Sequence, residues 1–141
     1  MATDIKKMTD DYILAWNSHD VNKILTFFTN DCIYEDLAFG IVNHGKKELT
    51  AFVNSSFVDI PDVKFEVKSV FGASDWGGME WVMSGTFVHS SIPGIPATGK
   101  TFSVRGASIS QLHNGKIIRN SDYYNLATFL QQVGLMPGQS K

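Results

Sequence analysis

The stretch FSVRGASISQLHNGKIIRNSDYY, residues 102–124, holds two runs rich in β-branched and aromatic residues on either side of Asn114-Gly115. A two-residue Asn-Gly loop is the strongest short-range signal for a β-hairpin, because both positions adopt positive φ. The pattern therefore predicts antiparallel strands over Phe102–Leu112 and Lys116–Tyr124.

The register of this hairpin decides which side chains share a face. If His113 pairs with Lys116, Ala107 pairs with Asp122, and Arg105 becomes a diagonal neighbour of Asp122. That face also carries Ala107, Ile109, Asn120 and Tyr124, and the opposite face carries Val104, Gly106, Ser108, Arg119, Ser121 and Tyr123. A slip of one residue would exchange the two faces.

Outward from the hairpin, the chain changes from a helical period to a period of two. Helices are expected over Asp4–Trp16, after Asp20 with Phe28 on its apolar face, and after Gly45, and a short strand over Asp31–Leu37. Strands are then expected from Val63 to Val67 and over Glu80–His89 with a turn over Asp75–Gly78 between them, followed by a loop over Ser90–Gly99 and a last short helix from Leu126 that ends before Gly134. Segregated helices and strands indicate an α+β fold, and 141 residues suit one domain over 1–141.

Composition excludes several classes of protein. The net charge of -2 offers no basic excess for nucleic acid, and no apolar run is long enough to span a membrane. A single cysteine, Cys32, cannot form an intramolecular disulfide, and the four histidines lack metal-ligand spacing. With a polar N-terminus in place of a signal peptide, we expect a reduced cytoplasmic protein without metal or cofactor.

One constellation of residues carries chemistry. If the helices cover the face with Arg105 and Asp122, a guanidinium, a carboxylate and the Tyr124 phenol converge in an apolar concavity. Burial would raise the pKa of Asp122 and Arg105 would lower it, which suits a general acid or base. The residues alone leave open a structural Arg–Asp pair, which is the commoner arrangement.

Short motifs along the chain bring a family into view. They are Ala15-Trp16-Asn17 through Asp20, Tyr34-Glu35-Asp36, Ile60-Pro61-Asp62, Gly85-Thr86, Gly94-Ile95-Pro96-Ala97-Thr98-Gly99-Lys100, Asn114-Gly115-Lys116-Ile117, Asp122 and Leu130-Gln131-Gln132-Val133-Gly134-Leu135. In this order and spacing the chain resembles the SnoaL-like polyketide cyclases of the nuclear transport factor 2-like superfamily.

The resemblance implies a cone-shaped α+β barrel of the nuclear transport factor 2-like or cystatin-like kind. N-terminal helices would pack inside a strongly curved antiparallel sheet, around an apolar cavity, and the outer sheet face would form a homodimer. The implied chemistry is a metal-free intramolecular aldol closure of a polyketide, with Asp122 as the acid/base. The sequence departs from many relatives at Phe87, where they have a histidine.

Two sister activities match some of the same positions. Steroid isomerases of the superfamily have an Asp base at the position of Asp36 and an oxyanion-hole tyrosine at that of Tyr12, but their acidic donor falls on Ala107. Limonene epoxide hydrolases are similar at Arg105 and Asp122, and again need an Asp at Ala107.

The combined expectation is a cyclase or isomerase that moves a proton next to a carbonyl of an apolar cyclic or polyketide-like substrate. Asp122 and Asp36 would be acid/base groups, Arg105 would set their charge state, and Tyr12 and Tyr34 would donate hydrogen bonds. The substrate would contact Trp16, Tyr34, Trp81, Phe87 and Tyr124. The alternative is a non-catalytic ligand-binding or dimeric adaptor domain, and burial of both carboxylates in one pocket would favour chemistry.

Overall fold

Six strands form one curved sheet in the computed structural model, which describes residues 3–138. The elements are α1 (Ile5–Asn17), α2 (Val21–Leu25), β1 (Phe28–Asp36), β2 (Ile41–His44), α3 (Gly45–Asp59), β3 (Lys64–Ala73), β4 (Trp76–Thr86), β5 (Thr101–His113), β6 (Lys116–Tyr124) and α4 (Leu126–Gln132). The strand order is β2-β1-β6-β5-β4-β3, and only the β1–β6 pair is parallel.

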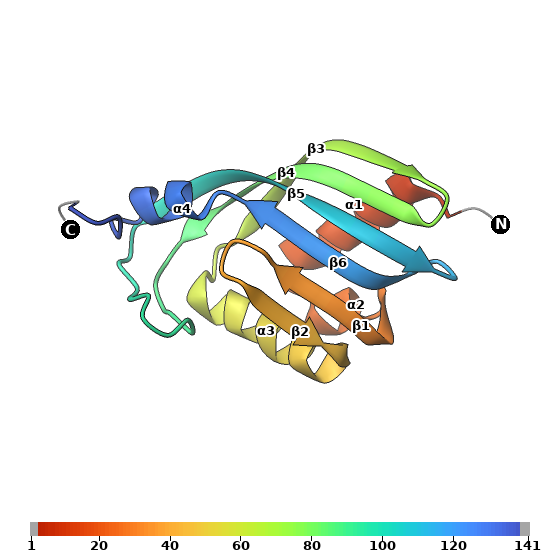
Figure 1. Cartoon of the computed structure of the whole chain (residues 1–141), viewed down its shortest axis with the longest axis horizontal. Coiled ribbons are helices and arrows are strands. Elements are labelled where there is room, and N and C mark those ends of the chain that lie inside the picture. Colours follow the sequence, from red (N-terminus) through yellow and green to blue (C-terminus); the bar gives the residue numbers. More distant parts are fainter. Residues whose placement is uncertain (1–2, 139–141) are drawn as a thin grey trace.

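The helices cover one side of this sheet (Figure 1). Helix α1 packs on β3, and helix α3 packs on β1 and β2. Helix α4, near the C-terminal end of the chain, lies against β5. The predicted α+β class, with helices held against a strongly curved sheet, is confirmed. No helix in residues 3–138 is long and apolar enough to cross a membrane.

Local signals set most helix boundaries. Asp4 caps α1 by accepting from the Lys7 amide at 3.0 Å, and Asp20 caps α2 by accepting from the Lys23 amide at 3.0 Å. Phe28, predicted on a face of the second helix, instead begins β1 and pairs with Ile117 of β6.

Two strand assignments from the sequence need correction. The four-residue β2 was missed, and it pairs with β1 immediately before α3 begins. Strand β4 begins at Trp76, within the segment predicted as a turn. Gly77 and Gly78 are part of the strand because they pair with both β3 and β5, and the side chains of Ile5 and Phe71 lie over them.

The predicted hairpin turn forms, but the predicted register is wrong beyond it. Asn114 and Gly115 adopt φ of 51° and 75°, and Leu112 pairs with Ile117 as expected. Gln111 then pairs with Arg119, so Ile118 is an extra residue in β6. This β-bulge shifts every later pair by one position, and Asp122 lies opposite Ser108 instead of Ala107.

The bulge exchanges the two faces of β5 relative to β6. Arg105 and Ala107 lie on the outer face, where Arg105 is exposed, while Val104 and Ser108 are buried on the inner face. The predicted contact between Arg105 and Asp122 is therefore wrong, as is the assignment of Val104 to the outer surface.

On the inner face of the sheet, Gly106 stands where a side chain would not fit. Gly106 of β5 pairs with Trp81 of β4, and the Trp81 ring lies directly over the Gly106 Cα. A β-carbon at position 106 would collide with the six-membered part of that ring. The missing side chain thus makes room for a ring that is almost fully buried.

We predict that Gly106→Ala displaces Trp81 and lowers the free energy of unfolding by about 1–3 kcal/mol, the usual cost of overpacking. Urea denaturation measures the change. Ala107→Ser, which adds one atom on the outer face next door, serves as the control and should change stability by less than about 0.5 kcal/mol. Equal stability of the Gly106→Ala variant and the unmodified protein would contradict this packing.

Candidate active site

A cavity of about 370 Å³ lies between the inner face of the sheet and helix α3. Its walls carry the rings of Trp16, Phe52, Phe65, Trp81, Phe87 and Phe129. All five residues predicted to contact a substrate line it, namely Trp16, Tyr34, Trp81, Phe87 and Tyr124. Asp36 and Asp122 open into the same space, which is the arrangement that favours chemistry over a solvated adaptor surface.

The parallel pairing of β1 with β6 brings the two carboxylates together. Asp36 lies directly opposite Asp122. Tyr34 precedes Asp36 by two residues and Tyr124 follows Asp122 by two residues, so each tyrosine lies on the same face as the carboxylate of its own strand. The hydrogen bonds cross between the strands: Tyr34 of β1 donates to Asp122 of β6, and Tyr124 of β6 donates to Asp36 of β1 at 2.8 Å. Each strand thus supplies the donor for the other strand's carboxylate.

Asp122 is held by three side-chain donors. Ser108 donates to Oδ1 at 2.6 Å, Asn120 donates to the same oxygen at 2.8 Å, and Tyr34 donates to Oδ2. Burial raises the pKa of Asp122 to about 6, these hydrogen bonds oppose the rise, and the nearby charge of Asp36 adds to it. A carboxyl group with such a pKa exchanges a proton readily near neutral pH.

Asp36 is also buried, and its pKa is shifted less than that of Asp122. It accepts from the Phe39 amide at 3.0 Å and from the Tyr124 hydroxyl. Burial raises its pKa, and the hydrogen bonds from Phe39 and Tyr124 partly offset that rise. Two carboxylates in register with each other cannot both ionise without cost, so their titrations are coupled.

Tyr12 and Arg105 lie away from the cavity. Tyr12 is buried behind it, in a space of about 20 Å³ that it shares with Trp16, Tyr34, Ser108 and Asp122. Burial and then the Asp122 charge raise the pKa of Tyr12. Its role as a donor to substrate stays a prediction, whereas Arg105 on the outer face cannot set the charge state of a carboxylate inside.

The register also bears on the sister activities. Ala107, the position where both sister activities need an acidic residue, faces outward beside Tyr123 and Glu80. Two positions of the epoxide-hydrolase pattern, Arg105 and position 107, therefore lie outside the cavity. The residue of β5 that faces inward opposite Asp122 is Ser108. It could not be selected from the sequence, because the regular hairpin register without the bulge puts Ser108 on the other face from Asp122.

A third carboxylate was missed as well. Asp59, the last residue of α3, is buried and lines the cavity. It accepts from the Ser91 amide at 3.0 Å, from the Ser91 hydroxyl at 2.8 Å and pairs with His89 Nδ1 at 2.8 Å. These bonds fasten the loop of residues 87–100 to α3. The only sign of Asp59 in the sequence is that a carboxylate stands at the end of an amphipathic helix.

Within residues 3–138 no group of three histidine, cysteine or carboxylate side chains is placed to hold a metal ion. The polar groups of the cavity are instead hydroxyls, amides and paired carboxylates. Such a set can accept a proton from carbon, return it to oxygen and hold a carbonyl compound against apolar walls.

This chain is similar to known proteins along most of its length. The family model of SnoaL-like polyketide cyclases matches residues 6–133. A cyclase named aurE from Calcarisporium arbuscula is 29% identical over 121 residues, covering 84% of this chain and 85% of that protein.

Two solved structures share the fold. A protein of ketosteroid isomerase-like fold from Catenulispora acidiphila DSM 44928, in complex with trimethylamine, superposes with a TM-score of 0.79 at 24% identity, over 99% of this chain and 100% of that one. TsrD from Streptomyces laurentii superposes with a TM-score of 0.81 at 20% identity, over 94% and 96%. The fold is thus the predicted nuclear transport factor 2-like one, and the chain belongs to the family of SnoaL-like polyketide cyclases.

Proposed function

We propose that the cavity closes a ring in an apolar, polyketide-like substrate by acid/base catalysis without a cofactor, and that Asp122 moves the proton. The observation that carries the proposal is the Asp122 carboxyl group, which is buried among three donors, has its pKa raised to about 6 and opens into an aromatic-walled cavity. The family and the cyclase aurE support ring closure as the reaction class.

The proposed reaction is an intramolecular aldol addition. The Asp122 carboxylate takes a proton from a carbon next to a carbonyl, and the electron pair of that C–H bond forms the new C–C bond to a second carbonyl carbon. The π pair of the second carbonyl moves to its oxygen, which takes the proton back from Asp122. Atoms and charge balance, and Asp122 returns to its starting form.

The walls of the cavity supply the other requirements. Trp16, Trp81 and Phe87 are almost fully buried, so they present rigid faces against which a flat substrate can stack. The Tyr34 and Tyr124 hydroxyls donate their hydrogens to Asp122 and Asp36, so they position the two carboxylates, and excluding water strengthens these hydrogen bonds. Asp36, directly opposite Asp122, is the second acid/base candidate.

We predict that Asp122→Asn abolishes proton transfer while ligand binding persists. The probe reaction is deuterium exchange at C1 of 2-tetralone, a flat bicyclic ketone, followed by NMR. The variant should lose about 100-fold or more of the catalysed rate, because an amide cannot accept the proton. Binding of 2-naphthol, measured by quenching of tryptophan fluorescence, should remain.

The matched control is Asp31→Asn, which makes the same change at an exposed position of β1. It should exchange 2-tetralone at the unmodified rate. Unchanged exchange in Asp122→Asn would contradict the role of Asp122. Binding of 2-naphthol by an unmodified protein that exchanges no deuterium would instead favour the non-catalytic binding domain.

The pH dependence of exchange follows from the Asp122 pKa. The active form is the carboxylate, so the rate should rise as pH increases through about 6 and level off above it. Asp36→Asn removes a negative charge that raises the pKa of Asp122, so any remaining activity should reach half its maximum at lower pH. A midpoint near pH 4 in the unmodified protein would contradict the assignment.

We further propose that the protein is a homodimer formed through the outer sheet face. Large rings are exposed there: Phe71 at 47%, Trp76 at 50% and Tyr123 at 49%. Around them the face is polar, with Arg119 paired to Glu35 at 2.6 Å, which resembles the apolar centre and polar rim of an interface. A cytoplasmic location stays a prediction.

We predict that sedimentation gives twice the 15.6 kDa mass of one chain, and that Phe71→Lys shifts the protein to the mass of a single chain by placing a charge in the interface. Val58→Lys makes the same change at an exposed apolar residue of α3 and should leave the dimer intact. A single-chain mass for the unmodified protein would contradict the dimer.

A further inference from the structure

A chain of hydrogen bonds runs across three neighbouring strands behind the Asp122 carboxyl group. Trp81 Nε1 of β4 donates to the Ser108 hydroxyl of β5 at 2.9 Å, and that hydroxyl donates to Asp122 Oδ1 of β6 at 2.6 Å. Trp81 and Ser108 are buried. The chain therefore joins a wall of the cavity to the carboxylate without passing through solvent.

The direction of these bonds is fixed by donor chemistry. An indole nitrogen can only donate, so the Ser108 oxygen must accept from Trp81. The single hydroxyl hydrogen of Ser108 is then free to point to Asp122 Oδ1. Without the indole N–H, the same hydroxyl could rotate and present a lone pair to the carboxylate, which would repel it.

A second chain reaches the same oxygen. The Ser110 hydroxyl donates to Asn120 Oδ1 at 2.8 Å, which leaves the Asn120 amide nitrogen to donate to Asp122 Oδ1 at 2.8 Å. With two donors on Oδ1 and the Tyr34 hydroxyl on Oδ2, the carboxyl plane is held from three sides. Since Oδ2 has a single donor, it has the lone pair available to accept a proton from substrate.

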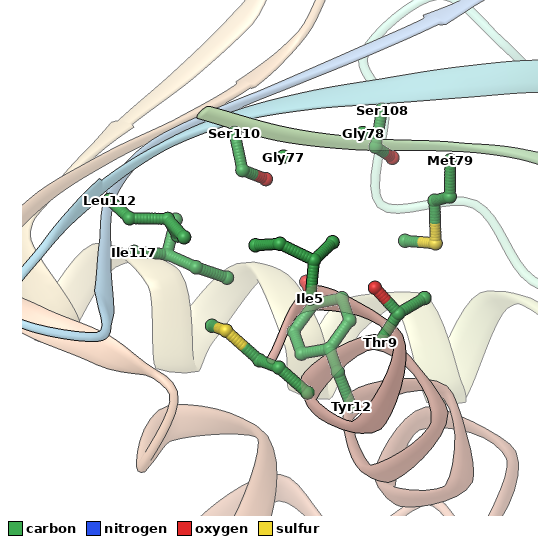
Figure 2. Close-up of a pocket in the computed structure, with 11 residues that line it drawn as sticks. Ile5, Thr9, Tyr12, Gly77, Gly78, Met79, Ser108, Ser110, Leu112 and Ile117 are labelled. Carbon is green, nitrogen blue, oxygen red and sulfur yellow. The ribbon is translucent and has the colours of Figure 1, made fainter. Parts of the chain in front are cut away.

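Ser108 also lines a small pocket that is separate from the cavity. Figure 2 shows Ser108 and Ser110 on the sheet above this pocket, opposite Thr9 and Tyr12 of α1. The pocket has a volume of about 40 Å³, enough for one or two water molecules. Ser108 lines this pocket and Asp122 does not.

We propose that Ser108, oriented by the Trp81 indole, is a positioning residue that keeps Asp122 Oδ1 occupied and aims Oδ2 at the substrate. This inference rests on the proposed role of Asp122 as the proton-transferring group. It gives Trp81 two tasks, since its ring forms the cavity wall while its N–H sets the direction of the Ser108 hydroxyl. A shift of the Trp81 ring when a substrate binds would therefore change the hydrogen bond that Ser108 donates to Asp122.

The test compares two variants of the same shape, Ser108→Thr and Ser108→Val, which differ only in the hydroxyl group. The readout needs no substrate: the carboxyl ¹³C shift of Asp122 is titrated in protein labelled at aspartate, and its signal is assigned by its absence in Asp122→Asn. Losing a hydrogen bond to the charged form should raise the midpoint of Ser108→Val by about one pH unit above that of Ser108→Thr.

Two further variants keep the test decisive if the buried methyl groups prevent folding. Trp81→Phe retains a ring but removes the indole N–H, and it should raise the midpoint by a smaller amount. Thr9→Val removes a hydroxyl that lines the same small pocket, and it should leave the midpoint unchanged. The pH at half-maximal exchange of 2-tetralone should move with the midpoint in every active variant.

The outcomes separate this inference from the proposed function. If Asp122 titrates near 6 in the unmodified protein but identically in Ser108→Val, Ser108→Thr and Trp81→Phe, the positioning role is overturned and the function stands. If Asp122 of the unmodified protein titrates near its ordinary value of 3.8, the proposed function is contradicted.

Discussion

The parallel pairing of β1 with β6 is the constraint on which the site depends. It places Asp36 and Asp122 opposite each other on the concave side of the sheet, and the tyrosine of each strand donates to the carboxylate of the other. The other walls of the cavity come from α1, α3, α4, the neighbouring strands and the loop after β4. Strands β1 and β6, in the middle of the sheet, therefore set the charge distribution of the cavity.

That arrangement has an energetic cost that the surrounding donors offset. A buried carboxyl group is disfavoured in its charged form, and a second one beside it raises the cost further. Ser108, Asn120 and Tyr34 compensate Asp122, and Tyr124 with the Phe39 amide compensates Asp36. The balance leaves Asp122 with a pKa near neutrality, where a base is both available and strong enough to act.

The sequence predicted the helices, the α+β class and the Asn114-Gly115 turn. The aromatic residues that were expected to contact a substrate all line the cavity. It misplaced Arg105, because one extra residue, Ile118, shifts the pairing of β5 with β6 and reverses the faces. A bulge changes composition and hydrophobic periodicity too little to be recognised in the sequence, so the regular register that follows from the turn was predicted.

Asp36 was found by resemblance, and Asp122 by both the hairpin pattern and the resemblance, whereas their partners required the structure. Ser108 and Asp59 have neighbours that are distant along the chain, so only the folded arrangement brings them to the cavity. The same holds for the crossed Tyr34 and Tyr124 bonds, since parallel pairing of the first and last strands cannot be inferred from either strand alone.

The most direct measurement is a crystal structure with bound 2-naphthol, a flat aromatic analogue of the enol that the proposed reaction forms. We predict that the ring lies between Trp81 and Phe52, with its hydroxyl-bearing edge against the Asp122 carboxyl group. Ligand bound outside the cavity, or inside it with the oxygen turned away from Asp122 and Asp36, would contradict the assignment of this pair as the reacting groups.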